Sequence, residues 1–320
     1  MATLTAIVVT PVRNEAWILD RFLRCASLWA DHIVIADQGS TDGSREIAAR
    51  HPKVTLIDNP GPEYDEGARQ RLLLEAARGF PGKRLIFALD ADEILSATWA
   101  ESAAFRGLSD AAPGTVVRMP WANVLPGLRS CWLPEEDIVF GYVDDGADHH
   151  GERIHSVRLP VAPSAPSVSP ADIRVLHYQY ADWERMKSKQ RWYQCWELIN
   201  LPNKRPIQLY RQYHHMDAIP PDRVQPLPER WIAPYEAEGI DMRSVTDQAH
   251  YPWDDEVAGW IATYGAKRFE KLDIWDGRWE AADPRGPLTR LVHRWLRATQ
   301  DGYDRGRIRL VQRVLIPFGW

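Results

Sequence analysis

The chain has 320 residues, 45% of them hydrophobic and 26% charged, which is typical of a folded globular protein and excludes a disordered, collagen-like or coiled-coil chain. Its three cysteines are too widely spaced for a C-x-x-C metal or redox motif, and their odd number argues against a disulfide framework. The first apolar run has no basic segment ahead of it, and no run approaches the ~20 apolar residues of a membrane span. We therefore expect a cytoplasmic protein.

Charge is distributed unevenly along the chain. The formal net charge of the whole chain is −5, but residues 285–320 contain eight arginines and two aspartates, a net charge of +6. The preceding 284 residues therefore have a net charge of −11. A large nucleic-acid footprint needs basic stripes, so we do not expect a nucleic-acid partner.

The first hundred residues alternate strand and helix patterns. Four short apolar runs predict strands, at 6–9, 33–36, 54–57 and 84–89. Helical spacing of apolar residues predicts helices over 17–28 and 66–78. Such units pack as a mostly parallel sheet with helices on both faces, so we expect an α/β fold. Ligands of these sheets bind beyond the carboxyl ends of the strands, and the segments 10–15, 37–43 and 90–93 are polar at those ends.

Beyond residue 110 the pattern is weaker. The predicted elements are strands at 115–119 and 173–177, a helix over 182–200, an acidic loop over 135–152 and a Pro/Ser loop over 161–170. Arginine-rich amphipathic helices, broken near Gly302, are expected over 288–316. We expect three parts: an α/β domain over 1–200, a Pro/Trp-rich, largely helical extension over 201–284 and a basic amphipathic segment over 285–320.

A pair of aspartates follows the fourth predicted strand. Asp90 and Asp92 lie two residues apart, so both carboxylates can project in the same direction. Paired carboxylates suit Mg²⁺ or Mn²⁺, and Mg²⁺ is often held by one or two carboxylates and substrate phosphates. A surface loop or a helix N-cap is the alternative explanation of D-x-D, but its place after a buried strand favours the metal. No P-loop or G-x-G-x-x-G motif follows the first strand, so a bound diphosphate would depend on the cation and on arginine.

Four stretches within residues 4–95 together resemble one known family. They are VTPVRNE at 9–15, IADQGSTDG at 35–43, EGARQ at 66–70 and LDADE at 89–93. In this order they resemble a family-2 glycosyltransferase with the GT-A fold of nucleotide-diphospho-sugar transferases. Gln38 and Gln70 depart from the residues most frequent at these positions. The resemblance covers less than a third of the chain and says little about the acceptor.

The resemblance implies a metal-dependent, inverting transfer of a sugar from a nucleoside diphosphate sugar, with UDP favoured, to an acceptor hydroxyl. It implies donor binding by Pro11, Arg13, Asn14, Glu15, Asp37, Arg69, Asp90 and Asp92. Pro11 and Glu15 would line the nucleoside pocket, and Asp37 would accept a hydrogen bond from the base. Arg69 would face the diphosphate.

The resemblance also implies a metal and a catalytic base. Asp90 and Asp92 would hold Mn²⁺ or Mg²⁺ against the phosphates, where the cation stabilises the leaving nucleoside diphosphate. Some related enzymes add a downstream histidine, for which His177 is the candidate, although a hydrogen-bonded structural role explains it equally. The acceptor must lose a proton to a carboxylate. The candidate bases are Asp144 and Asp145 in the acidic stretch and Asp182, which a helix N-cap also explains.

Two other functions stay open. A sugar-1-phosphate nucleotidyltransferase has a similar sheet but needs a glycine-rich, arginine-containing loop after the first strand, which residues 11–15 do not provide. A catalytically silent nucleotide- or glycan-binding module would lack the acceptor-side carboxylate. The acceptor is equally open, whether a glycan, a lipid-linked molecule or another hydroxyl compound.

The basic C-terminal segment has two explanations. A basic face beside a Trp/Leu face is typical of a helix that lies in a membrane interface. Residues 286–320 would then hold the protein peripherally at the inner face of a membrane. Alternatively, this positive segment packs onto the negatively charged remainder of the chain.

Overall fold

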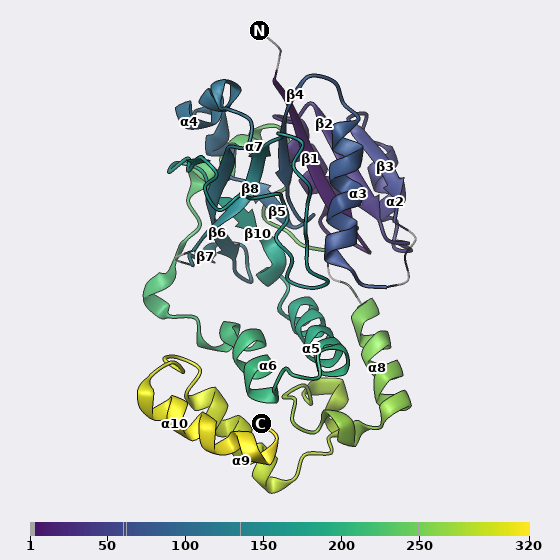
Figure 1. The fold of residues 1–320 in the computed structure, drawn as a ribbon, viewed down its shortest axis with the longest axis vertical. Helices are drawn as coiled ribbons and strands as arrows, with labels where there is room; N and C mark the ends of the chain where they lie inside the picture. The colour runs from purple at the N-terminus through teal and green to yellow at the C-terminus, as the bar shows by residue number, and fades with distance from the viewer. Residues whose placement is uncertain (1–3, 60, 62, 135, 247, 249) are drawn as a thin grey trace. The chain divides into compact units, whose positions relative to one another are not determined.

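Figure 1 shows the computed structural model of the chain, which describes residues 4–320 except 60, 62, 135, 247 and 249. The chain divides into two compact units. Unit 1 consists of Met1–Asp182 and Val224–Asp247, and unit 2 consists of Trp183–Arg223 and Gln248–Trp320. These limits differ from the predicted ones at residues 200 and 284, because the predicted helix over 182–200 opens unit 2 and a later segment returns to unit 1.

Four parallel strands form the first half of the sheet in unit 1. They are β1 (Leu4–Val12), β2 (His32–Asp37), β3 (Val54–Asp58) and β4 (Lys83–Ala88). Their order across the sheet is β3-β2-β1-β4. The connecting helices are α1 (Leu19–Ser27), α2 (Ser44–Ala49) and α3 (Glu66–Arg78). The four predicted strands and the two predicted helices are confirmed.

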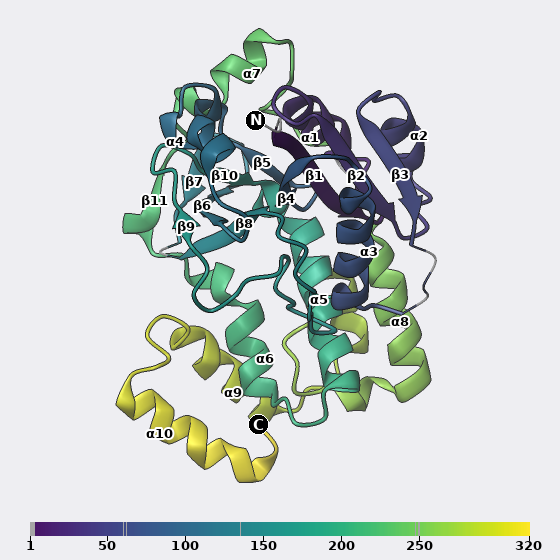
Figure 2. The same ribbon diagram turned by 45° about the horizontal axis from the view of Figure 1, so that its top comes forward.

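Both faces of these strands are buried. Val8 and Phe87 pack with α1 in one apolar core, whereas Ile7 and Ile86 pack with α3 in a second core. Successive side chains of a strand point to opposite faces, so a strand covered on both faces must be apolar at every position. Each large apolar side chain buried in this way contributes about 1.5–3 kcal/mol. The two helices therefore cover opposite faces of the strands, and both are labelled in Figure 2.

The sheet continues beyond β4 as a mixed sheet. β8 (Asp137–Val143) pairs antiparallel with both β4 and β6 (Val116–Val124). β10 (Val175–His177) pairs parallel with β6 and antiparallel with β5 (Glu93–Leu95). The remaining short strands are β7 (Ser130–Trp132), β9 (Ser167–Val168) and β11 (Val224–Pro226). The expected α/β class is confirmed, as are the predicted strands near residues 115 and 173.

The predicted acidic loop over 135–152 is wrong across β8. Residue 135 lies outside the described residues, but Asp137–Val143 forms a strand in the interior of the sheet, between β4 and β6. The apolar residues of this strand are flanked by acidic residues on both sides, which made the segment resemble a solvated loop. From Phe140 to Val143 every residue of β8 is buried, because helices or loops cover both faces there.

Most of the remaining α-helices belong to unit 2. Unit 1 adds α4 (Ala103–Arg106) and α7 (Ala233–Ala237). Unit 2 contains α5 (Trp183–Asn200), α6 (Pro206–Tyr213), α8 (Pro252–Tyr264), α9 (Pro287–Ala298) and α10 (Gly306–Leu315). The predicted helix over 182–200 and the pair of helices over 288–316 are confirmed, and so is the helical character of the C-terminal region.

Polar and apolar contacts together hold the helices of unit 2. Asp254 of α8 accepts a hydrogen bond from Ser188 of α5 at 2.8 Å and pairs with Arg191 of α5 at 3.1 Å. Arg211 of α6 donates to the carbonyl of Leu296 in α9 at 2.7 Å. An apolar cluster lies beside this bond, formed by Ile207, Tyr210, Val292, Leu296 and Trp320. α9 is therefore a packed helix of unit 2.

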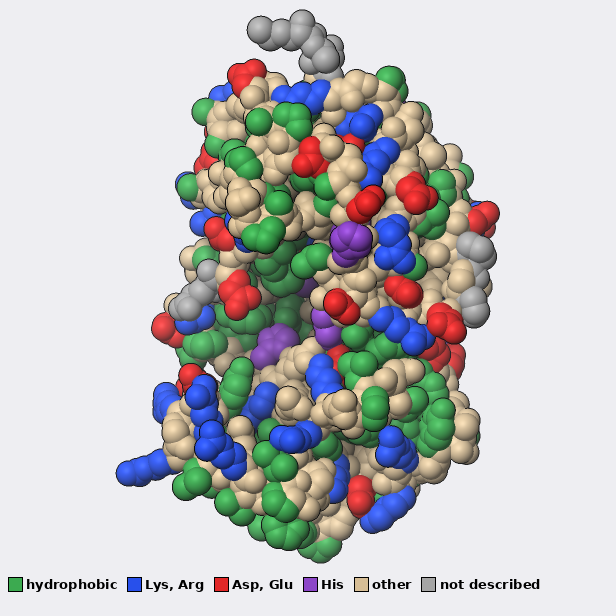
Figure 3. All heavy atoms as spheres, viewed as in Figure 1, with side chains coloured by type: hydrophobic (Ala, Val, Ile, Leu, Met, Phe, Trp, Pro, Cys, Tyr) green, Lys and Arg blue, Asp and Glu red, His purple; other side chains and the backbone are tan. Residues whose placement is uncertain are grey.

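α10 differs from α9 because every one of its residues is at least partly exposed. Leu310 and Val314 are 64% and 60% exposed, and Phe318 just beyond the helix is 71% exposed. Figure 3 shows Lys and Arg side chains gathered over this part of unit 2, with hydrophobic side chains between them. Among the described residues, no helix has the length and apolar character needed to cross a membrane.

Candidate functional site

The carboxyl ends of the parallel strands meet at one edge of the sheet in unit 1. Val12 of β1 lies opposite Asp37 of β2, and Val9 lies opposite Ala88, two residues before Asp90. β10 ends at His177, which lies opposite the first residue of β5. The polar residues that follow the strands therefore gather in one region, as expected for an α/β sheet.

The loops that follow β1 and β2 are joined by hydrogen bonds. The Asn14 amide donates to Ser40 Oγ at 2.9 Å, and the Thr41 amide donates to Asn14 Oδ1 at 2.8 Å. The Glu15 amide donates to Ser44 Oγ at 2.9 Å. Asn14 has φ 58°, a left-handed conformation that asparagine tolerates better than most residues. These bonds hold the first two motifs together before any ligand is present.

The other predicted nucleoside residues lie in or beside these loops. Pro11 is half-buried within β1 and lies opposite Ala36 of β2, and Arg13 is exposed in the loop that follows. Glu15 is half-buried and accepts a hydrogen bond from Trp17 Nε1 at 2.7 Å. The structure brings these residues and Asp37 to one edge of the sheet. Their contacts with a nucleoside stay a prediction.

Asp37 has one oxygen engaged and one without a partner. Oδ2 accepts hydrogen bonds from the amides of Gly39 and Ser40, both at 3.2 Å, and from Arg45 Nη1 at 2.7 Å. Oδ1 is buried and has no hydrogen-bond partner among the described residues. Buried polar atoms are ordinarily hydrogen-bonded, so Oδ1 has the capacity to accept a bond from a ligand.

Asp92 and His177 form the second polar group of the site. Asp92 is 3% exposed, and its Oδ2 has no hydrogen-bond partner among the described residues. Its Oδ1 lies 3.9 Å from His177 Nε2. His177 Nδ1 lies 2.9 Å from Asn123 Oδ1, so an N–H at Nδ1 can donate to Asn123 while Nε2, the nitrogen on the Asp92 side, is available as a ligand. Trp121 stacks on this ring with a centroid distance of 4.9 Å.

This pair fits a divalent cation. An unpartnered carboxylate oxygen and an imidazole lone pair are both metal ligands, and a metal-binding histidine usually donates its other N–H to an oxygen, as His177 does here. Within the described part of the chain, no group of three His, Cys, Asp or Glu side chains could hold a metal ion. A cation at Asp92 would take its further ligands from water and phosphate oxygens, as Mg²⁺ ordinarily does.

Asp90 is held by a half-buried arginine. Arg158 Nη2 lies 2.9 Å from Asp90 Oδ2, and the same guanidinium donates to both oxygens of Glu93. Glu93 also accepts hydrogen bonds from the Asp90 amide at 2.8 Å and from Trp121 Nε1 at 2.9 Å. Burial raises the pKa of Glu93. Burial lowers the pKa of Arg158, but Asp90 and Glu93 outweigh that effect and raise it.

Arg158 and Glu93 are functional-site residues that the sequence reasoning missed. Arg158 follows an irregular segment with no periodic pattern, so nothing local indicated that it reaches Asp90 across 68 positions of the chain. Glu93 was visible as the last residue of the LDADE motif. Glu93 is a charged residue at the start of a buried strand. This position could have indicated that Glu93 has a partner, because carboxylates are rarely buried alone.

A backbone segment at residues 151–158, here called the strap, packs against the first turn of α3. The amides of Glu66 and Gly67 donate to the carbonyls of Arg153 and Glu152, both at 3.0 Å. A Cβ at Gly67 would lie 2.5 Å from the carbonyl oxygen of Gly151. Arg69, in the first turn of α3, is half-buried and lies over the ring of Tyr64 at 5.7 Å. Its contact with a diphosphate stays a prediction.

Asp144 and Asp145, two of the predicted bases, lie at the opposite ends of the strands from Asp90, and their role as base stays a prediction. Asp144 is fully buried between Arg78 at 3.0 Å and Arg84 at 2.9 Å. Arg84 stands near the start of β4, six residues before Asp90, so the two ends are roughly 20 Å apart. Asp145 lies at the same far end, and a hydrogen bond from Tyr142 lowers its pKa, which weakens it as a base.

Asp182 is the remaining predicted base. It is half-buried and directly precedes α5, five residues after His177. Both the role as base and the role as helix cap stay predictions.

Comparison with known proteins identifies the N-terminal part of the chain. Residues 7–108 match the sequence model of glycosyl transferase family 2. No curated protein matches the chain. Among solved structures, the chain is similar to glucosyl-3-phosphoglycerate synthase from Mycobacterium tuberculosis, solved with Mn²⁺, UDP and glucosyl-3-phosphoglycerate. That match has 18% identity and a TM-score of 0.28, and it covers 36% of this chain and 43% of the other.

Two further solved structures are comparably distant. A 4-diphosphocytidyl-2C-methyl-D-erythritol synthase is 13% identical over 45% of this chain and 73% of its own, with a TM-score of 0.28. A mannose-1-phosphate geranyltransferase from Thermus thermophilus is 21% identical over 45% of this chain and 51% of its own, with a TM-score of 0.26. The chain thus spans less than half the length of the synthase named first. All four motifs fall within residues 7–108, the part of the chain that matches the model of glycosyl transferase family 2.

Proposed function

We propose that the protein is a glycosyltransferase that moves a sugar from a nucleoside diphosphate sugar, with UDP favoured, to an acceptor hydroxyl, with a divalent cation and inversion of the anomeric centre. The observation that carries this proposal is Asp92 Oδ2, a buried carboxylate oxygen without a partner among the described residues, at the strand ends of a family 2 domain. Buried charges are ordinarily paired or bound to metal. A cation with a diphosphate would satisfy it.

Each residue of the site would have a separate task. Asp92 and His177 would hold the cation, whose charge stabilises the negative charge on the departing diphosphate. Asp37 would accept the N–H of a uracil ring through Oδ1. Arg158 forms an ion pair with Asp90. The Asp90 side chain is therefore already in position before the donor binds and need not become ordered on binding. Asp182 is the base that we propose for the acceptor proton, because Asp144 and Asp145 lie at the other edge of the sheet.

A donor screen tests this function. Thermal unfolding is followed with UDP-, GDP-, ADP- and dTDP-sugars, each with Mn²⁺ and with chelator. We expect a UDP-sugar to raise the Tm only with the cation, and the same sugar to release UDP slowly by hydrolysis. Binding without any release of UDP, in the presence of a broad acceptor panel, would identify a silent binding module instead. Stabilisation by a nucleoside triphosphate together with a sugar 1-phosphate would identify a nucleotidyltransferase.

Asp37→Asn is expected to weaken UDP binding about tenfold to hundredfold, the range for a lost hydrogen bond to a charged group. The donors from Gly39, Ser40 and Arg45 would orient the new amide oxygen toward themselves. The NH₂ group would then occupy the position of Oδ1 and oppose the N–H of the base. Calorimetry with UDP and Mn²⁺ measures the change.

The control for this variant is Arg45→Gln, which removes the ion pair but leaves Asp37 in place. It should bind UDP with nearly wild-type affinity, and ribose 5-phosphate should not distinguish any of the three proteins. An equal loss of UDP affinity in both variants would show that Asp37 acts only by holding its loop.

We further propose a peripheral membrane contact through α10. Its exposed apolar side chains lie among Arg307, Arg309 and Arg313. Apolar and basic side chains on one exposed helix suit an anionic membrane surface, where each arginine adds about 1 kcal/mol. α9, by contrast, uses its apolar face within unit 2.

Vesicle sedimentation is expected to pellet the protein with phosphatidylserine vesicles at low salt and to release it at high salt. The variant Leu310→Ser/Phe318→Ser should stay in the supernatant, since both side chains are exposed and their loss leaves the fold intact. Tyr264→Ser, which alters another exposed residue of unit 2, is the matched control. A wild-type protein that never pellets excludes the membrane contact.

A further inference from the structure

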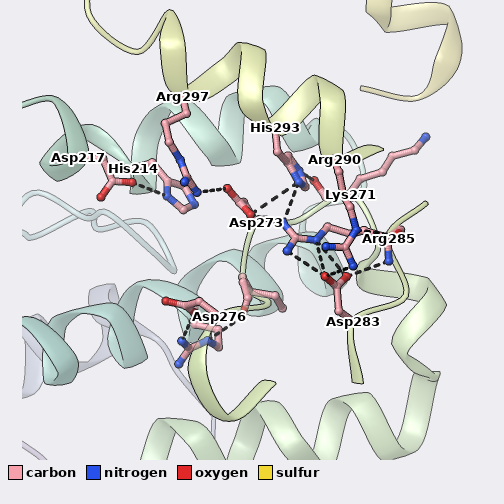
Figure 4. Close-up of polar contacts among 12 residues, drawn as sticks. His214, Asp217, Lys271, Asp273, Asp276, Asp283, Arg285, Arg290, His293 and Arg297 are labelled. Carbon is pink, nitrogen blue, oxygen red and sulfur yellow. Dashed lines mark hydrogen bonds and ion pairs between the residues drawn. The ribbon is translucent and has the colours of Figure 1, made fainter. Parts of the chain in front are cut away.

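Unit 2 contains a cavity of its own, with a volume of about 1100 Å³. Its walls come from α5, from the end of α6, from residues 273–276 and from α9 with the preceding Arg285. Figure 4 shows the polar side chains that converge there from these elements. Ligand sites for small molecules are commonly of this size, roughly 300–1,000 Å³. None of the lining residues lies within the family 2 match, so the cavity is built from residues other than those that the motifs identify.

One wall of the cavity has an excess of positive charge. Arg285 and Arg290 share Asp283, and Arg285 and Arg297 share Asp273. Three arginines therefore compete for two carboxylates. Arg294, on the same helix and also lining the cavity, is exposed and has no carboxylate partner within the described ranges.

The acidic residues of the other walls are already paired. Asp217 accepts from His214 at 3.1 Å. Asp276 pairs with Arg191 at 2.8 Å. Since these carboxylates have partners of their own, the surplus guanidinium charge of Arg285 and α9 is available to an anion. Guanidinium groups recognise phosphates and carboxylates through paired N–H donors.

Four further residues that line the cavity have a polar atom without a partner. Gln190 Oε1, Gln194 Oε1, Trp275 Nε1 and His214 Nε2 are buried and have no hydrogen-bond partner among the described residues. Gln190, Gln194 and Trp275 are 7%, 2% and 3% exposed. Polar atoms so deeply buried are ordinarily hydrogen-bonded. Neutral amide, indole and imidazole groups of this kind suit the hydroxyls of a ligand, which both donate and accept.

We propose that this cavity binds a small hydroxylated anion, a polyol or sugar that bears a phosphate or carboxylate group. The anionic group would lie against Arg294 and its neighbours on α9, and the hydroxyls would satisfy Gln190, Gln194 and Trp275. The arginines need an anionic group, and the glutamines and Trp275 need hydroxyls. A purely apolar molecule would satisfy neither set, and a bare polyol would leave the arginines without an anion. The proposal rests on contacts within unit 2 alone and does not depend on glycosyl transfer.

Titration calorimetry with glucose 6-phosphate, glucuronate, glucose and inorganic phosphate tests the proposal on the full chain. We expect glucose 6-phosphate or glucuronate to bind at least about tenfold more tightly than glucose or phosphate. Tighter binding of glucose 6-phosphate would identify the anionic group as a phosphate, and tighter binding of glucuronate would identify it as a carboxylate. Equal affinity for inorganic phosphate would overturn the hydroxyl contacts, and no binding of either sugar anion at millimolar concentration would overturn the site.

Two variants test the arginine contacts and the glutamine contacts separately. Arg294→Gln should reduce the affinity about tenfold, whereas Arg268→Gln, at an exposed arginine of unit 2 that does not line the cavity, should not change it. Gln194→Met should also weaken binding while raising the Tm of the free protein, because it replaces an amide whose buried Oε1 has no partner with an apolar side chain of similar size. Identical behaviour of the two arginine variants, or unchanged affinity in Gln194→Met, contradicts the proposed contacts.

Discussion

Asp92→Asn is expected to abolish the cation-dependent part of UDP-sugar binding and to lower the rate of UDP release by at least about 100-fold. Metal charge stabilisation of this kind contributes several kcal/mol to a transition state, and each 1.4 kcal/mol is tenfold in rate. The fold should be unaffected, because Oδ2 has no partner to lose and Oδ1 lies 3.9 Å from His177 Nε2. Removing a buried charge whose Oδ2 has no partner should leave the free energy of unfolding unchanged or raise it.

The measurements are calorimetry with UDP across a Mn²⁺ series, and UDP release under the same conditions. Asp110→Asn is the matched control, since Asp110 is exposed in another part of unit 1. A variant at Asp92 that keeps the wild-type Mn²⁺ dependence would remove Asp92 from the metal site. It would leave the family assignment of residues 7–108 untouched.

Asp144→Ala is expected to lower the free energy of unfolding by about 3 kcal/mol, toward the lower end of the 3–5 kcal/mol range for breaking a buried ion pair. The carboxylate is fully buried, while Arg78 and Arg84 are 25% and 23% exposed, so water can partly solvate the arginines that remain. The specific activity of the folded protein should not change. Urea denaturation with an activity assay well below the midpoint separates the two effects.

Asp145→Asn provides the comparison at the neighbouring position. Asp145 is exposed and bonded to Tyr142, so its replacement should cost only about 0.5–1.5 kcal/mol. If Asp144→Ala were instead stable and inactive, Asp144 would have to be reconsidered as a catalytic base.

The parallel strands and the D-x-D pair were predictable because their causes are local. A strand covered on both faces is a continuous apolar run, and the residues after it must lie at the ligand-binding edge. Asp37 and Asp92 follow β2 and β4 at this edge, and both have a buried oxygen without a partner in the described part of the chain.

The features that could not be predicted depend on contacts between residues that are far apart in the sequence. Arg158 reaches Asp90 from an irregular segment, and Asp144 meets Arg78 across 66 positions. β8 was hidden because a strand bordered by acidic residues has the composition of a loop. The limits of the two units also depend on distant contacts, since the chain returns to unit 1 at Val224 after a segment that belongs to unit 2.

The strap at residues 151–158 explains why the second residue of the EGARQ motif, Gly67, is a glycine. Glycine inside a helix costs up to about 1 kcal/mol relative to alanine, so Gly67 weakens the first turn of α3. In return, the absent side chain lets the backbone of Gly151 pass in direct contact with the helix. Seven residues further along, the same segment delivers Arg158 to Asp90. Two motifs that look independent in the sequence are thereby tied together, and any side chain added at position 67 would displace the arginine that orients the D-x-D pair.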